Sequence, residues 1–77
     1  MQRQVEINDD FITLGQFLKK AQIIDTGGQA KFFIETNNIK INNKKPIGRG
    51  SKIFAGDSVW IEGYLYKVIK KEKEEIN

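Results

Sequence analysis

The sequence predicts an α+β fold, in which two short N-terminal helices pack on a small, mostly antiparallel sheet. Two Thr-x-x-Gln capping boxes, which begin at Thr13 and Thr26, each stand at the start of a helical pattern. After Asn38 the apolar spacing changes from helical to alternating, with turn residues between the alternating segments. With 77 residues, we expect one domain over 1–77, with a thin core and a site on its surface.

The first helix is expected directly after Thr13, which can cap it together with Gln16. A short strand over residues 3–8 ("RQVEIN") precedes it, because polar and apolar residues alternate weakly there. The segment 13–24 ("TLGQFLKKAQII") then carries one apolar stripe at helical spacing, formed by Leu14, Phe17, Leu18, Ala21 and Ile24. This stripe predicts the helix face that the sheet covers.

The second helix is expected to begin at or just after Thr26 and to end near Asn37 or Asn38. Either asparagine tolerates the left-handed conformation in which many helices end. Its buried face is expected to hold Ala30, Phe33 and Ile34. The two capping boxes therefore predict two short helices joined by an abrupt corner.

The remaining chain predicts strands and tight turns. The expected strands are "IKIN" (39–42), "SKIF" (51–54), "SVWIE" (58–62) and "YLYKVI" (64–69). The turns between them are "NNKKP", "AGD" and the pair Glu62-Gly63, and Asn42 and Asn43 can adopt positive φ in the first of these. The last residues, 70–77, carry mixed charge and are expected to fray.

Charge is distributed unevenly along the chain. The net charge is +3, but residues 1–38 contribute −1 and residues 39–77 contribute +4. The segment from Lys40 to Lys52 has five basic residues and no acidic one. Such a segment suits a polyanion such as nucleic acid, although a solvated loop is the alternative.

Several classes of protein are disfavoured by what the sequence lacks. With no cysteine there is no disulfide framework, which fits the reducing cytoplasm. No apolar run reaches membrane-spanning length, and the N-terminus is too polar for a signal peptide, so we expect no membrane partner. Histidine is also absent, the acidic residues are scattered, and Ser51 and Ser58 have no evident neighbouring base. We therefore expect no enzyme, no metal or cofactor, and no small-molecule substrate.

The stretch "TGGQAK" (26–31) combines a helix start with two glycines. Its spacing is that of neither a Walker loop nor a dinucleotide fingerprint. Gly27 and Gly28 leave two compatible interpretations open: close packing at the corner, or a phosphate at the bare amino end of the helix. Lys31 follows one turn later and is either solvated or beside that phosphate. Arg49, between Gly48 and Gly50, and Lys52 are either solvated loop charges or part of the same basic surface.

The aromatic residues are expected to be mainly structural. Phe17 and Phe33 belong to the helical stripes, while Phe54 and Trp60 fit the sheet. Phe32 lies off the main face of the second helix. Partial burial under the N-terminal segment is the preferred interpretation for it, with base stacking as the alternative.

These motifs together resemble a known family. The stretch "ITLGQFLKKAQIIDTGGQAKFFIETNNIKINNKKPIGRGSKIFAGDSV" resembles the S4 RNA-binding domain, and most of all the small stand-alone S4-like proteins of bacteria (the YaaA and YbcJ type). The resemblance covers a core motif of about residues 11–62. It rests on "LGQFLK", "TGGQAK", the strand-turn "IKINN", a basic R-G-x-K stretch and an x-G-D turn, in that order. Fewer arginines than in many S4 domains favour the stand-alone subgroup.

The resemblance implies an αL motif, an L-shaped basic surface that grips structured RNA, and links the protein to ribosomal RNA and ribosome biogenesis. The RNA-binding positions that it implies are Lys19, Thr26, Gly27, Gly28, Lys31, Lys40, Asn42, Lys44, Arg49, Gly50 and Lys52. Arg3, Lys70 and Lys71 lie outside the motif and are expected to be solvated. The function expected is a non-catalytic cytoplasmic protein that binds structured RNA or a ribosomal particle. The alternative is a module that docks on an acidic protein partner in ribosome assembly or replication.

Overall fold

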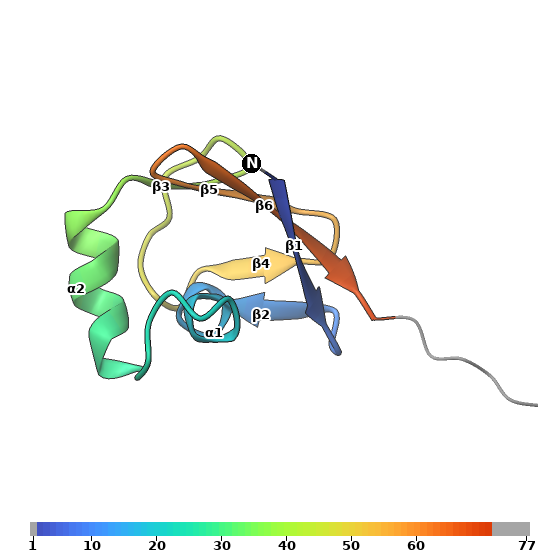
Figure 1. Cartoon of the computed structure of the whole chain (residues 1–77), viewed down its shortest axis with the longest axis horizontal. Helices are drawn as coiled ribbons and strands as arrows, with labels where there is room; N and C mark the ends of the chain where they lie inside the picture. The colour runs from blue at the N-terminus through green and yellow to red at the C-terminus, as the bar shows by residue number, and fades with distance from the viewer. Residues whose placement is uncertain (1, 72–77) are drawn as a thin grey trace, which may run out of the picture.

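The computed structural model describes residues 2–71 and contains two sheets and two helices (Figure 1). The elements follow in the order β1 (Gln2–Ile7), β2 (Phe11–Thr13), α1 (Leu14–Lys20), α2 (Gly28–Thr36), β3 (Ile39–Ile41), β4 (Lys52–Phe54), β5 (Ser58–Ile61) and β6 (Tyr64–Lys70). Helix α1 lies beneath the larger sheet, and α2 lies beside α1 at one end of the molecule (Figure 1). This arrangement confirms the predicted α+β class.

The larger sheet has the strand order β1-β6-β5-β3. Strand β5 pairs antiparallel with both β6 and β3, whereas β1 pairs parallel with β6, in a register that places Val5 opposite Val68. The sheet is therefore mostly antiparallel, as predicted, with one parallel pair at its β1 edge. Because side chains alternate across a strand, Val5 and Val68 both face the core with Val59 of β5.

Helix α1 begins as its sequence predicts. The Thr13 amide donates to Gln16 Oε1 (3.0 Å) and the Gln16 amide donates to Thr13 Oγ1 (3.3 Å), which completes the capping box. Three residues of the predicted stripe, Leu14, Phe17 and Leu18, are fully buried. The Phe17 ring meets the Tyr66 ring edge-on at 5.7 Å between centroids, so α1 is anchored to the middle of the sheet.

Helix α1 ends at Lys20, earlier than the apolar stripe through Ile24 suggested. The Ile23 amide donates to Leu18 O (2.9 Å), the Gln22 amide donates to Lys19 O (3.0 Å), and Gln22 has φ 60°. This is the Schellman pattern, with glutamine in the left-handed position that glycine usually occupies. Ile24 is still buried, because the chain turns back under the core after the helix has ended.

Helix α2 makes a smaller contribution to the core, with Ala30 buried and Phe33 and Ile34 half-buried. It ends at Thr36, and the capping residue Asn37 is extended (φ −122°). The Asn37 side chain donates through Nδ2 to Phe33 O (3.0 Å). The predicted left-handed asparagine is therefore wrong, because a side-chain hydrogen bond closes this helix.

The second sheet is formed by two short strands, β2 and β4, which pair antiparallel. Strand β2 was not predicted, because three residues between a turn and a helix carry no periodic signal. The expected turns are present: Asn42 and Asn43 have φ 50° and 68°, and Glu62-Gly63 has φ 47° and 88°. These values match the positive φ at both central residues of a type I′ hairpin turn.

The expectation of a frayed tail from residue 70 is wrong for its first two residues. Lys70 belongs to β6, and the Lys71 amide donates to Ile7 O (2.8 Å). The rest of that predicted tail, 72–77, lies outside the described residues. Within residues 2–71, neither helix has the length and apolar character needed to cross a membrane.

Candidate nucleic-acid interface

The amino end of α2 is open. Gly27 is its capping residue (φ −63°, ψ −27°), and no side chain caps it. Gln29 Oε1 accepts from the amides of Asp25 (2.7 Å) and Thr26 (3.1 Å), but the Thr26 hydroxyl returns no hydrogen bond. Only half of the predicted second capping box is therefore present. The Gly27 and Gly28 amides donate to no other residue within 2–71, which leaves two N–H groups at the positive end of the helix dipole.

Neither glycine at this corner is required by packing. A Cβ at Gly27 would have no heavy atom within 4 Å, and one at Gly28 would meet only Thr26 Oγ1 at 3.9 Å. Both glycines also lie outside the left-handed region. The close-packing interpretation of the corner is thus wrong, and the backbone of the first turn of α2 is accessible to a ligand.

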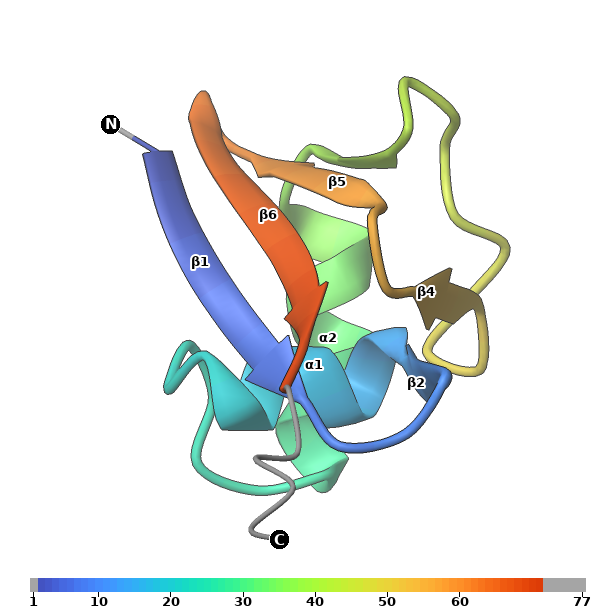
Figure 2. The same ribbon diagram turned by 90° about the vertical axis from the view of Figure 1, so that its right-hand side faces the viewer.

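We refer to the connection between β3 and β4, residues 42–51, as the basic loop. Backbone hydrogen bonds hold it on the amino end of α1. The Leu14 amide donates to Ser51 O (2.8 Å) and the Gly15 amide donates to Arg49 O (2.9 Å). Ser51 Oγ in turn accepts from the amides of Ile47 (3.0 Å) and Gly48 (3.2 Å). Figure 2 shows this connection leaving the larger sheet and returning to β4 beside the start of α1. The first amides of α1 are therefore occupied, in contrast to those of α2.

Gly15 is the point at which α1, α2 and the basic loop meet. A Cβ there would lie 3.5 Å from Arg49 Cβ, 3.6 Å from Arg49 O and 3.8 Å from Ala30 Cβ. No sequence motif assigned a function to this glycine. The only local signal was a glycine near the start of an otherwise good helix, where it costs up to about 1 kcal/mol relative to alanine.

Lys31 and Arg49 are brought together by this packing. They line one depression of about 360 Å³ between α2 and the loop, with Ile34, Glu35, Ile47 and Gly48. Both cations are exposed to solvent. Two of the predicted RNA-binding residues, distant in sequence, therefore share one concave surface, whose α2 side begins at Lys31, about one turn after the open end of the helix.

Lys52 is the first residue of β4, in the smaller sheet. Its Nζ lies 4.7 Å from the centroid of the Phe11 ring, in cation–π geometry. Phe11 packs on Phe54 with ring centroids 5.5 Å apart, and both rings remain partly exposed. Lys52 thus extends the basic loop onto an aromatic pair and not into the depression of Lys31 and Arg49. Gly50, between them, is exposed, and a Cβ there would meet nothing within 4 Å.

The predicted residues of the strand-turn lie elsewhere. Lys40 is opposite Trp60 on the exposed face of the larger sheet, and these two line a separate shallow depression of about 280 Å³. Asn42 has a structural function, because its Oδ1 accepts from the Ser58 amide (2.9 Å) while its own amide donates to Ser58 O. Lys44 is exposed in the turn, and Lys19 is exposed in the last turn of α1.

The aromatic residues differ from expectation at one position. Phe17 is buried and Phe33 half-buried, as predicted, and Phe54 and Trp60 lie in strands with 49% and 39% of their surface exposed. Phe32, however, is 71% exposed, so its predicted partial burial is wrong. Its ring stands one helical turn after Gly28, on the outward side of α2.

Comparison with known proteins agrees with this architecture. The S4 domain family matches residues 5–69. A curated relative, the probable ribosome maturation protein RlbA of Bacillus subtilis (strain 168), is 42% identical over 64 residues, which are 83% of this chain and 90% of the relative. No solved structure gives a significant match. The family match spans most of the chain, including both helices and all six strands in whole or in part. This chain therefore belongs to the S4 domain family.

Proposed function

We propose that this protein is a non-catalytic RNA-binding protein that acts in ribosome maturation in the cytoplasm, and that its target is structured ribosomal RNA or a ribosomal particle. Membership in the S4 family and the name of the Bacillus relative support this proposal. The observation that carries it is the open amino end of α2, which stands beside the depression that Lys31 and Arg49 share.

The chemistry of this surface suits an RNA backbone. Duplex RNA is recognised mainly through phosphates, 2′-hydroxyls and shape, because its deep major groove hides the bases. The amides of Gly27 and Gly28 can donate to one phosphate, while the guanidinium of Arg49 can hold a second in bidentate geometry. The loop is fixed on α1 through backbone hydrogen bonds, so the backbone of Arg49 is positioned before RNA arrives.

Salt dependence and a matched pair of variants test the proposal. Wild type is expected to bind purified ribosomal RNA with an affinity that falls log-linearly with salt. Lys31→Gln with Arg49→Gln removes two phosphate contacts, each of which contributes about 0.7 to 0.9 to the slope of log affinity against log salt concentration. The magnitude of this slope is therefore expected to fall by about 1.4 to 1.8. Lys67→Gln with Lys70→Gln is the control, because it removes the same charge outside this surface.

Two results would contradict the proposal. The first is equal loss of affinity in both double variants, which would indicate a general charge effect. The second is wild type that binds neither ribosomal RNA nor ribosomal particles at low salt. Circular dichroism of each variant establishes that its fold is intact.

A further inference from the structure

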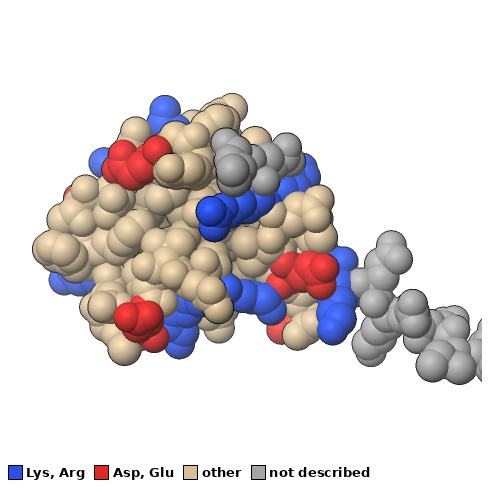
Figure 3. Space-filling model, viewed as in Figure 1, with Lys and Arg blue, Asp and Glu red and all other residues tan. Residues whose placement is uncertain are grey.

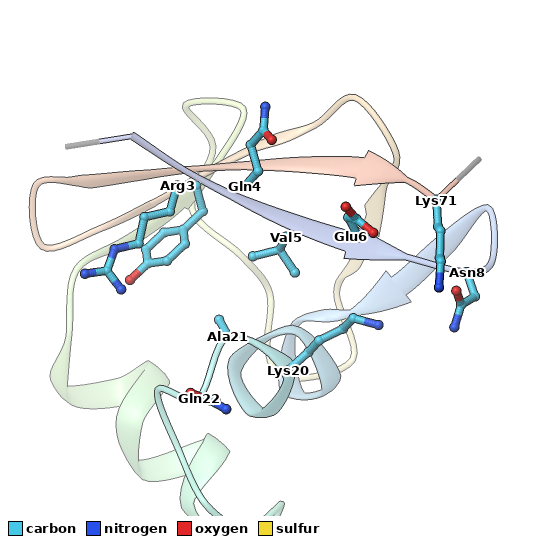
Figure 4. A pocket seen from close by; sticks show the side chains of 10 residues that line it. Arg3, Gln4, Val5, Glu6, Asn8, Lys20, Ala21, Gln22 and Lys71 are labelled. Atoms are coloured by element: carbon cyan, nitrogen blue, oxygen red, sulfur yellow. The ribbon is translucent and has the colours of Figure 1, made fainter. Parts of the chain in front are cut away.

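A second basic groove lies on another side of α1. It has a volume of about 430 Å³ and runs between the edge strand β1 and the C-terminal end of α1 (Figure 4). Three elements supply its cations: Arg3 comes from β1, Lys20 from the last turn of α1, and Lys71 from the residue after β6. Basic side chains cross the middle of this face of the molecule, and acidic groups lie at its upper left and lower left and, on the right, among basic side chains (Figure 3).

The strand pattern directs Arg3 into this groove. Side chains alternate along β1, so Arg3 lies on the same face of the strand as the buried residues Val5 and Ile7. Its side chain therefore leaves β1 on the side that faces α1. Figure 4 shows Arg3 and Gln22 toward one end of the groove and Lys71 toward the other, with Lys20 between them. The three cations are therefore spread along the groove, as a chain of phosphates requires, and are not gathered at one point.

Little negative charge offsets these cations. Within residues 2–71 the one salt bridge joins Lys70 to Asp10, so Arg3, Lys20 and Lys71 have no described carboxylate oxygen within 4.0 Å. Glu6 is the single acidic residue that lines the groove, and its parity places it on the other face of β1 from Arg3. Among residues 2–71, the groove therefore holds an excess of unpaired positive charge.

Gln22 contributes a polar side chain to the groove, although its backbone conformation disfavours residues other than glycine. Its φ of 60° belongs to the left-handed region, where glycine is the common residue at a helix end. Here a glutamine keeps that position, and its side chain lines the groove with hydrogen-bonding groups. Retained strain of this kind is more frequent at binding sites than elsewhere.

We propose that the groove of Arg3, Lys20, Gln22 and Lys71 is a second phosphate-binding site, which holds backbone phosphates of the same RNA that contacts α2. This inference rests on the proposed function. Six residues of chain join Gln22 in the groove to Gly28 at the start of α2, so their Cα atoms are at most about 20 Å apart. A duplex of about 16 base pairs, the length that double-stranded RNA-binding domains span, is more than enough to reach both surfaces.

A matched set of variants tests this site separately from the first. Arg3→Gln with Lys20→Gln is expected to lower the salt slope for purified ribosomal RNA by about 1.4 to 1.8. The same control, Lys67→Gln with Lys70→Gln, has an equal net charge and is expected to retain more of the slope. Arg3→Lys with Lys20→Arg keeps both charges and is expected to keep the wild-type slope, which excludes a mere change in packing.

Each remaining outcome identifies a different failure. Suppose that Arg3→Gln with Lys20→Gln lowers the salt slope no more than the control does, while Lys31→Gln with Arg49→Gln loses binding. The groove proposal is then wrong and the proposed function stands. If wild type binds neither ribosomal RNA nor ribosomal particles, both are wrong. The last measurement is a titration of wild type with inorganic phosphate, followed by amide chemical shifts. Suppose that phosphate shifts the amides of Arg3 and Gln22 while Arg3→Gln with Lys20→Gln leaves the salt slope for RNA unchanged. That combination would assign the groove to a free phosphorylated ligand and would overturn the RNA assignment.

Discussion

The amide of Gly15 donates a hydrogen bond to the carbonyl oxygen of Arg49, with an N···O distance of 2.9 Å, and the absent side chain of Gly15 leaves room for Arg49 Cβ. One residue of α1 thereby fixes the backbone of the residue that we place on RNA. The basic loop is thus held both by α1 and by the hydrogen bonds that Ser51 makes within the loop.

Enlarging Gly15 is expected to displace the loop. Gly15→Val adds methyl groups toward Arg49 and Ala30, and overpacking of this kind costs about 1 to 3 kcal/mol. RNA affinity should fall with it, as measured by fluorescence anisotropy. Gly15→Ala is the control: its Cβ would stand at ordinary contact distances of 3.5 to 3.8 Å, so binding should be kept. Equal binding by the valine variant would show that the loop is positioned independently of α1.

Gly28→Ala is expected to separate stability from binding. Its Cβ meets nothing closer than Thr26 Oγ1 at 3.9 Å, so alanine should raise the free energy of unfolding by up to about 1 kcal/mol. The same Cβ stands where a phosphate would approach the helix amides. Losing a hydrogen bond to a charged group lowers affinity by about tenfold or more. Urea unfolding and RNA titration measure the two effects. A variant that is more stable and binds normally would contradict a phosphate at this corner.

Two phenylalanines provide a test of the core assignment. Phe17 is fully buried, and Phe17→Ala is expected to cost about 3 to 5 kcal/mol. That loss is comparable to the lower end of the stability of a 77-residue domain, which is about 4 to 12 kcal/mol at about 0.05 to 0.15 kcal/mol per residue. Phe32 is 71% exposed, and Phe32→Ala is expected to leave the melting temperature unchanged or slightly higher. Thermal unfolding followed by circular dichroism compares them. A large loss at Phe32 would mean that its ring is covered in solution.

The exposed ion pair between Asp10 and Lys70 (2.8 Å) is expected to respond to pH and salt. The hydrogen bond and charge of Lys70 lower the pKa of Asp10, and Asp10 in the same way raises the pKa of Lys70. The lowered carboxyl pKa stabilises the fold above the ordinary aspartate pKa, and this is lost as pH falls through the lowered value. The raised lysine pKa stabilises below the ordinary lysine pKa, and this is lost as pH rises through the raised value.

Lys70→Gln removes this pair and is expected to return the pKa of Asp10 upward toward its ordinary value. A carboxyl-detected NMR titration measures that change. Because both groups are exposed, salt should reduce the difference between wild type and variant. A titration curve of Asp10 that does not move on substitution would show that the pair does not persist in solution.

Local signals predicted much of this fold. Thr13 and Gln16 form their capping box, and Asn42 and Asn43 adopt the positive φ that their turn requires. Such features depend on neighbours in the sequence. The pairing of β2 with β4 and of β1 with β6 depends on residues far apart, so no periodicity could indicate it.

The candidate site was predictable only in part, for the same reason. Lys31 and Arg49 followed from family motifs, and the structure places them on one depression. The groove of Arg3, Lys20 and Lys71 could not be predicted, because its members come from the first strand, the first helix and the end of the last strand. Phe32 was misjudged, because helical spacing gives the direction of a side chain but not whether another segment covers it.

The parallel pairing of β1 with β6 has a consequence for synthesis. Residues 2–7 find their partners at residues 65–70, so the first strand to leave a translating ribosome is among the last to be paired. Contacts of such sequence separation slow folding, and an unpaired strand edge favours aggregation while it waits. The nascent chain can form α1 and its corner early, but the groove that Arg3 and Lys71 line is complete only after β6 has paired with β1. A growing chain would therefore carry the α2 surface before it carries the groove.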